Sequence, residues 1–172
     1  MIVLDANLLL YAYDSLSTQH AKARAWIEQV FSGATLSGAT LSGATSSGAT
    51  SSGATSSGAT STGATPVGLP WQTVAAFLRV MTNPRLPGNR FTPEEAVEVV
   101  DSWLEQPNVR LLAPGDDHWI VFRQMIIEGQ ASGGLITDAQ LAALTIEHGG
   151  VLHTTDRDFA RFPGLRWKNP LT

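Results

Sequence analysis

The sequence predicts a three-layer α/β/α sandwich with a central parallel sheet, plus one inserted low-complexity repeat loop. Short apolar runs, such as 2–4 and 150–154, alternate along the chain with longer segments whose apolar residues recur at helical spacing. Strands that alternate with helices are typical of a parallel sheet covered on both faces. The hydrophobic content of 43% supports a folded body with a proper core.

Length and composition narrow the class of protein further. The 172 residues suit one domain, and the absence of cysteine excludes disulfides, thiolate zinc sites and cysteine nucleophiles. A net charge of −4 argues against nucleic-acid binding by bulk electrostatics, so any such binding has to be local. Because no leader or membrane-spanning run stands out, we expect a soluble, cytoplasmic protein that does not contact a membrane.

A pentapeptide repeat occupies residues 32–65, with seven copies of Gly-Ala-Thr. The stretch has no charge and, after Leu41, no large apolar side chain, so it buries too little surface to offset its chain entropy. We expect a flexible surface loop without a catalytic role that interrupts a single domain spanning residues 1–172. The alternative is an ordered solenoid, because the first two copies resemble the pentapeptide repeats of β-helices.

The first half of the domain reads as two strands, each followed by helical sequence. Asn83-Pro84 ends the last of these helices. The expected elements are a strand at 2–4, a short helix through Tyr13, a helix at 18–31, a strand at 67–70 and a helix at 72–81.

The second half begins with a well-marked helix, in which Thr92 is the N-cap, Pro93 the first residue and Glu95 the partner in a capping box. Thr137 and Gln140 suggest a second capping box, which puts Asp138 in the first turn of its helix. The remaining elements are expected to be a strand at 109–113, a helix at 117–128, and a strand at 150–154 that follows the helix ending at Gly149.

Three aspartates, Asp5, Asp138 and Asp156, stand beside the first and last strands of the predicted sheet. Carboxylates gathered at the carboxyl edge of one sheet repel each other unless a cation lies between them. Mg²⁺ and Mn²⁺ take oxygen ligands of this kind, and a substrate that suits such a site carries phosphate. The pattern therefore predicts a metal-dependent nuclease, whereas any one of these aspartates alone is explained as a helix cap.

Three segments in this order resemble the PIN domain, and more narrowly the VapC-type ribonuclease toxins of bacterial toxin–antitoxin pairs. They are residues 2–7 (IVLDAN), 138–144 (DAQLAAL) and 154–159 (TTDRDF), and the likeness continues through 159–171. The resemblance implies that Asp5, Asp138 and Asp156 hold Mg²⁺ or Mn²⁺ and activate water for RNA cleavage. It also implies a homodimer and a small cognate antitoxin as partner.

Further residues are expected to assist the three aspartates. By the same resemblance, Asn7 and Thr154 support the site. Asp158 is a further acid close in sequence to Asp156. Arginine suits contacts with phosphate oxygens, so the candidates for phosphate contacts are Arg85, Arg157 and Arg161. For His153, inside an apolar strand, we expect a buried structural role.

One departure leaves two functions open. Members of this family usually carry another acid, most often Glu, on the helix that matches 72–81, whereas this helix has none and Phe77 or an adjacent residue stands at that position. Either the remaining acids suffice for catalysis, or the protein is a weakened or inactive PIN module that binds protein or RNA. A haloacid dehalogenase-like phosphatase is the weaker alternative, because its second carboxylate is replaced by Asn7.

Overall fold

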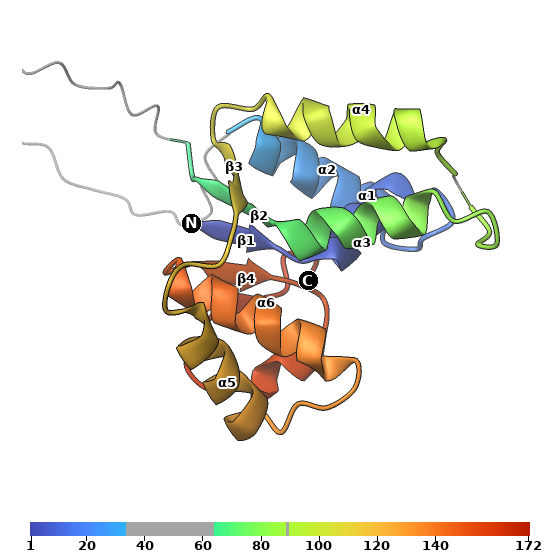
Figure 1. Ribbon diagram of the computed structural model, residues 1–172. Helices are drawn as coiled ribbons and strands as arrows, with labels where there is room; N and C mark the ends of the chain where they lie inside the picture. The colour runs from blue at the N-terminus through green and yellow to red at the C-terminus, as the bar shows by residue number, and fades with distance from the viewer. Residues whose placement is uncertain (34–63, 89) are drawn as a thin grey trace, which may run out of the picture.

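A parallel five-stranded sheet in the order β3-β2-β1-β4-β5 forms the centre of the computed structural model, which describes residues 1–33, 64–88 and 90–172 (Figure 1). All strand pairs are parallel, so the carboxyl ends of the strands share one edge of the sheet. The strands are β1 (Ile2–Leu4), β2 (Val67–Pro70), β3 (Val109–Leu112), β4 (Val151–His153) and β5 (Trp167–Lys168).

In the part of the chain that the structure describes, six α-helices cover the two faces of the sheet. Figure 1 shows α1 to α4 on one side of the strands, with α5 and α6 on the other. The predicted three-layer α/β/α class is therefore confirmed. The helices are α1 (Ala6–Tyr13), α2 (His20–Phe31), α3 (Trp71–Met81), α4 (Pro93–Leu104), α5 (His118–Glu128) and α6 (Leu135–Glu147).

Alternation along the strands divides the core into two apolar clusters. In β1, Ile2 and Leu4 belong to the cluster beneath α1 to α4, while Val3 belongs to the cluster beneath α5 and α6. This is the two-residue period of a strand buried on both faces. The same packing requires Gly68 in β2, because a Cβ there would lie 2.5 Å from Cδ1 of Leu112 in the neighbouring strand.

The predicted helices and strands are present with shifts of up to three residues at their ends, but one predicted cap is wrong. The capping box of Thr92 and Glu95 is present at the start of α4. The second one, between Thr137 and Gln140, is not: α6 already begins at Leu135, after Gly134, and no side chain caps it. Asp138 nevertheless lies in the first turn of α6, as expected.

Two short elements near the carboxyl terminus were not predicted from the sequence. A 3-10 helix, η1 (Arg157–Arg161), follows β4, and the two-residue strand β5 then pairs with β4. Within the described ranges, no helix has the length and apolar character needed to cross a membrane.

The loop expected at 32–65 lies mostly at positions 34–63, outside the described residues. The residues on its two sides are close together. A Cβ on Gly33 would lie 2.9 Å from Cβ of Ala64. Asn108 Nδ2 donates to the carbonyl of Val30 at 3.0 Å and to that of Thr65 at 3.3 Å, so one side chain ties both flanks to the start of β3.

Candidate active site

The carboxyl edge of the sheet brings the ends of β1 and β4 together. Asp5 directly follows β1 and precedes α1, and its backbone N–H donates to the carbonyl of His153 at 3.1 Å. Asp156 follows β4 and precedes η1. Parallel pairing of β1 with β4 thus places residues from opposite ends of the chain at one site.

Thr154 organises this site through one buried hydroxyl. Its Oγ1 donates to Asp5 Oδ2 at 2.7 Å and accepts from Asn7 Nδ2 and from the backbone N–H of Asp156, both at 3.0 Å. Because the single hydroxyl hydrogen goes to the carboxylate, the other two contacts have to be accepted. This fixes the orientation of the Asn7 amide. It leaves Asn7 Oδ1 as a buried acceptor without a partner among the described residues.

Two of the three aspartates, Asp5 and Asp138, have a raised pKa. Burial raises the pKa of Asp5, with a smaller contribution from the charge of Asp156, while the Thr154 hydrogen bond acts in the opposite direction. Burial also raises the pKa of Asp138 to about 6, and repulsion from Asp156 and Asp5 adds to this shift. This repulsion indicates that the carboxylates lie close enough together for their charges to interact.

The described residues contain no group of three His, Cys, Asp or Glu side chains already arranged to hold a metal ion. The chemistry of the residues nevertheless fits a hard divalent cation. The donors are carboxylate oxygens that repel one another, and a cation between them would relieve this repulsion. Shared coordination by Asp5, Asp138 and Asp156 stays a prediction.

The assisting residues fall into two groups. Asp158 and Arg161 are close to the aspartates: the Asp158 N–H donates to Asp156 Oδ1 at 2.8 Å, and Arg161 lies 3.9 Å from Asp158 Oδ1 and lowers the pKa of Asp138. Arg157 is exposed at the start of η1. Arg85 follows the far end of α3, whose 11 residues span about 16 Å, so it is separated from the edge of the sheet.

His153 has the structural role expected of it. The side chain is 2% exposed, its Nδ1 bonds with the carbonyl of Val151 at 3.1 Å, and its ring stacks on Trp26. Burial lowers the pKa of His153 to about 4. The imidazole is therefore neutral near pH 7.

Helix α3 contributes no acid to the site, as the sequence indicates. Phe77 is fully buried among the aromatic rings of Tyr13 and Trp103, so it faces the core and not the aspartates. Gln72 was not predicted from the sequence as part of this region. It is half-buried in the first turn of α3, and its Nε2 is buried without a partner among the described residues. The available signal was its place two residues after the end of a predicted strand.

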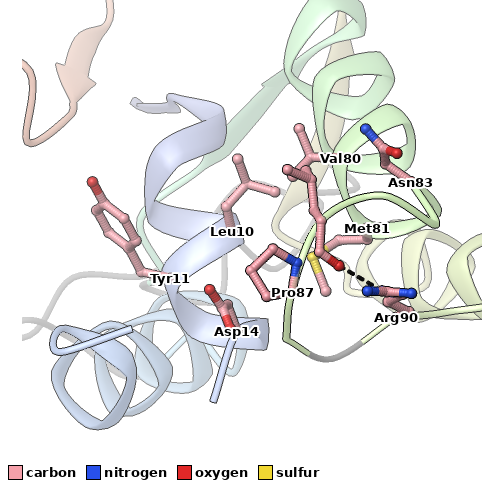
Figure 2. A pocket seen from close by; sticks show the side chains of 9 residues that line it. Leu10, Tyr11, Asp14, Val80, Met81, Asn83, Pro87 and Arg90 are labelled. Carbon is pink, nitrogen blue, oxygen red and sulfur yellow. Dashed lines mark hydrogen bonds between the residues drawn. The ribbon is translucent and has the colours of Figure 1, made fainter. Parts of the chain in front are cut away.

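A separate pocket of about 310 Å³ lies towards the carboxyl ends of α1 and α3 (Figure 2). It is mainly apolar, and none of the three aspartates lines it. The pocket is therefore distinct from the acidic site. Its lining residues are Leu10, Tyr11, Asp14, Val80, Met81, Asn83, Leu86, Pro87 and Arg90.

Comparison with known proteins defines the class of this fold. Residues 68–165 match the family model of the PIN domain. The chain is 33% identical to ribonuclease VapC33 and 32% identical to ribonuclease VapC43, both of Mycobacterium tuberculosis, over 171 residues. The alignments cover 99% of this chain and 99% and 96% of the two relatives. The chain thus belongs to the PIN domain family and, within it, to the VapC ribonucleases.

The fold also agrees with a solved structure. VapBC2 from Rickettsia felis, bound to a DNA fragment from its promoter, superposes with a TM-score of 0.59 at 13% identity, covering 98% of both chains. At this identity the likeness concerns the fold alone.

Proposed function

We propose that the protein is a Mg²⁺- or Mn²⁺-dependent endoribonuclease toxin that hydrolyses RNA phosphodiester bonds. One observation carries this proposal beyond family membership: Thr154 holds the Asp5 carboxylate in a fixed orientation, within electrostatic range of Asp156 and Asp138. A fixed set of carboxylates is what a hard cation requires of a protein.

In this proposal Asp5, Asp138 and Asp156 hold the cation. When bound, the cation makes water a stronger acid and offsets negative charge on the phosphate. Thr154 and Asn7 keep the Asp5 carboxylate oriented, and the Asp158 N–H restrains the Asp156 carboxylate. Since a carboxylate holds a cation in its ionised form, the raised pKa values of Asp5 and Asp138 imply that the cation competes with protons for the site.

The substrate is held by positive side chains near these acids. Arg161 and Arg157 lie on η1, directly after Asp156, and a guanidinium group matches the geometry of phosphate oxygens. Arg85, beyond the far end of α3, would meet a phosphate farther along the RNA.

The experiment is an RNA cleavage assay with Mn²⁺ on the purified protein and three variants. Asp5→Asn and Asp138→Asn are expected to abolish cleavage while leaving the fold intact, as judged by circular dichroism. Asp101→Asn, on the exposed face of α4, is the matched control and should cleave like the wild type. Cleavage retained by both site variants would refute the assignment.

The same assay decides the second candidate, a weakened or inactive PIN module that binds protein or RNA. The absence of any acid on α3 favours it. A wild-type protein that binds RNA but does not cleave it with either metal would support this module.

The proposed partners are a small cognate antitoxin and a second copy of the chain, both acting in the cytoplasm. The support is family membership together with exposed apolar side chains on α5, where Trp119 is 62% exposed, Ile120 66% and Ile127 58%. Expression of the toxin alone should arrest growth, and co-expression of the antitoxin should relieve it. Size-exclusion chromatography with light scattering should give the mass of a dimer.

A further inference from the structure

Among the described residues, several buried polar atoms lack partners, and two of them, in the first turns of α1 and α3, have complementary chemistry. Asn7 Oδ1, on α1, is an acceptor, and Gln72 Nε2, on α3, is a donor. A buried donor or acceptor that stays unpaired is costly, so such atoms in a native protein call for an explanation.

The arrangement of the two helices brings these residues to the same place. Helices α1 and α3 start from the neighbouring parallel strands β1 and β2, so their first turns lie at the same edge of the sheet. Thr73 Oγ1 donates to the carbonyl of Leu4 at 2.8 Å, which fixes the first turn of α3 beside the start of α1. Gln72 directly precedes Thr73 in the chain, and Asn7 lies three residues after Leu4. Both residues are therefore close to this contact.

Helical periodicity shows which sides of α1 and α3 face each other. Leu10 and Tyr11 of α1 line one pocket together with Val80 of α3 (Figure 2). Asn7 lies one turn before Leu10 and Tyr11, and Gln72 lies about 2.2 turns before Val80, within about a quarter turn of the same side of its helix. The two orphaned atoms thus belong to the facing sides of α1 and α3, at the end nearest the aspartates.

We propose that Gln72 is a positioning residue for the active site, donating its Nε2–H to one buried water that in turn donates to Asn7 Oδ1. The donors then form a chain in one direction: Gln72 through the water to Asn7, Asn7 to Thr154, and Thr154 to Asp5. The last two steps are hydrogen bonds of 3.0 and 2.7 Å. Gln72 would hold the Asn7 amide in place, the Asn7 amide would orient the Thr154 hydroxyl, and this hydroxyl would orient the Asp5 carboxylate. The consequence for metal binding rests on the proposed function.

The test replaces the donor while keeping the length of the side chain. Gln72→Met should weaken Mn²⁺ binding about tenfold in calorimetry, as expected for a residue that orients a metal ligand. Gln124→Met, at an exposed position on α5, is the matched control and should bind Mn²⁺ like the wild type. Gln72→Met with wild-type affinity would overturn the proposal, even if the variant unfolds at lower urea concentration.

A double-variant cycle tests the contact itself. If Gln72 acts through Asn7, the Asn7→Ala/Gln72→Met double variant should bind Mn²⁺ no more weakly than Asn7→Ala alone. Losses that multiply in the double variant would contradict the chain of hydrogen bonds.

The same cycle in urea, without metal, separates this inference from the proposed function. The double variant should unfold at the midpoint of the weaker single variant, and additive shifts in the midpoint would overturn the contact. If the wild type binds no Mn²⁺, the proposed function fails, and the urea cycle still decides whether the two side chains interact.

Discussion

At the scale of single residues, Thr154 connects the parts of the site through three hydrogen bonds of its hydroxyl group. Its hydroxyl contacts Asn7, Asp5 and the backbone of Asp156, which belong to segments near both ends of the chain. The side chain is fully buried, so these bonds form away from competing water.

The raised pKa of Asp138 predicts a pH dependence of stability in the metal-free protein. Its pKa is about 6 in the folded protein against 3.8 when unperturbed, so the folded state favours the neutral form. This contribution to stability is present below the unperturbed pKa and is lost as the pH rises through about 6. The loss is of the order of 1 kcal/mol, because the group is partly exposed and solvent screens the repulsion.

Urea unfolding of the wild type and of Asp138→Asn measures this effect. The variant should gain stability relative to the wild type between about pH 4 and about pH 7. A difference between the two proteins that does not change with pH would contradict the assigned repulsion. Saturating Mn²⁺ should stabilise the wild type more at the higher pH, where the carboxylates are ionised.

The sequence singled out the three aspartates as candidates, and the family resemblance added Asn7 and Thr154, but Gln72 was not predicted. Asp5, Asp138 and Asp156 were recognisable because each stands beside a strand or in the first turn of a helix, where position follows from local sequence. The unpartnered amide of Gln72 depends on how α3 packs on α1. Packing of this kind brings together residues that are distant in sequence, so it cannot be predicted from a local sequence pattern.

At the scale of elements, neighbouring positions on α3 face different surroundings. Phe77 is fully buried and packs against Trp103 with ring centroids 4.6 Å apart. Ala76 is half-buried, between Gln72 and Val80 on the side that faces α1. An acid could therefore reach the site from position 76, whereas one at position 77 would be buried in the core.

Two substitutions test this division of α3. Ala76→Glu should fold and bind Mn²⁺ more tightly than the wild type, because it adds a carboxylate on the side facing α1. Phe77→Glu should fail to fold, because it buries an unpaired charge in place of an aromatic ring. Calorimetry and circular dichroism check the two outcomes. A Phe77→Glu protein that folds normally would show that the faces are assigned wrongly.

The start of α6 shows why caps are harder to predict than helices. Thr137 and Gln140 have the spacing of a capping box, but a turn already begins upstream, where the N–H groups of Leu135, Ile136 and Thr137 donate to carbonyls three residues earlier. With its N–H already bonded in this way, Thr137 lies inside the helix and cannot act as an N-cap.

At the scale of the whole molecule, the strand order explains where the site lies. From β1, the chain continues through β2 and β3 on one side, and β4 and β5 lie on the other. The order reverses between β1 and β4, and open parallel sheets bind ligands at the carboxyl ends of strands beside such a reversal. Asp5 and Asp156 follow those two strands. The layers were predictable from alternation along the sequence, whereas β5 was not, because two residues carry too little pattern.

The repeat is expected to be dispensable for the fold. Gly33 and Ala64 lie close enough for direct joining, and Asn108 anchors the backbone on both sides. Deletion of residues 34–63 should therefore leave the urea midpoint and the RNA cleavage rate near those of the full chain. A deletion variant that does not fold would show that the repeat contributes to the core.

The central claim is that three aspartates from distant segments share one cation, and calorimetric titration of the metal-free protein with Mn²⁺ tests it most directly. We predict one site in the wild type and in Asp101→Asn, and loss of that binding in each of Asp5→Asn, Asp138→Asn and Asp156→Asn. Binding that survives all three substitutions in folded proteins would contradict the claim.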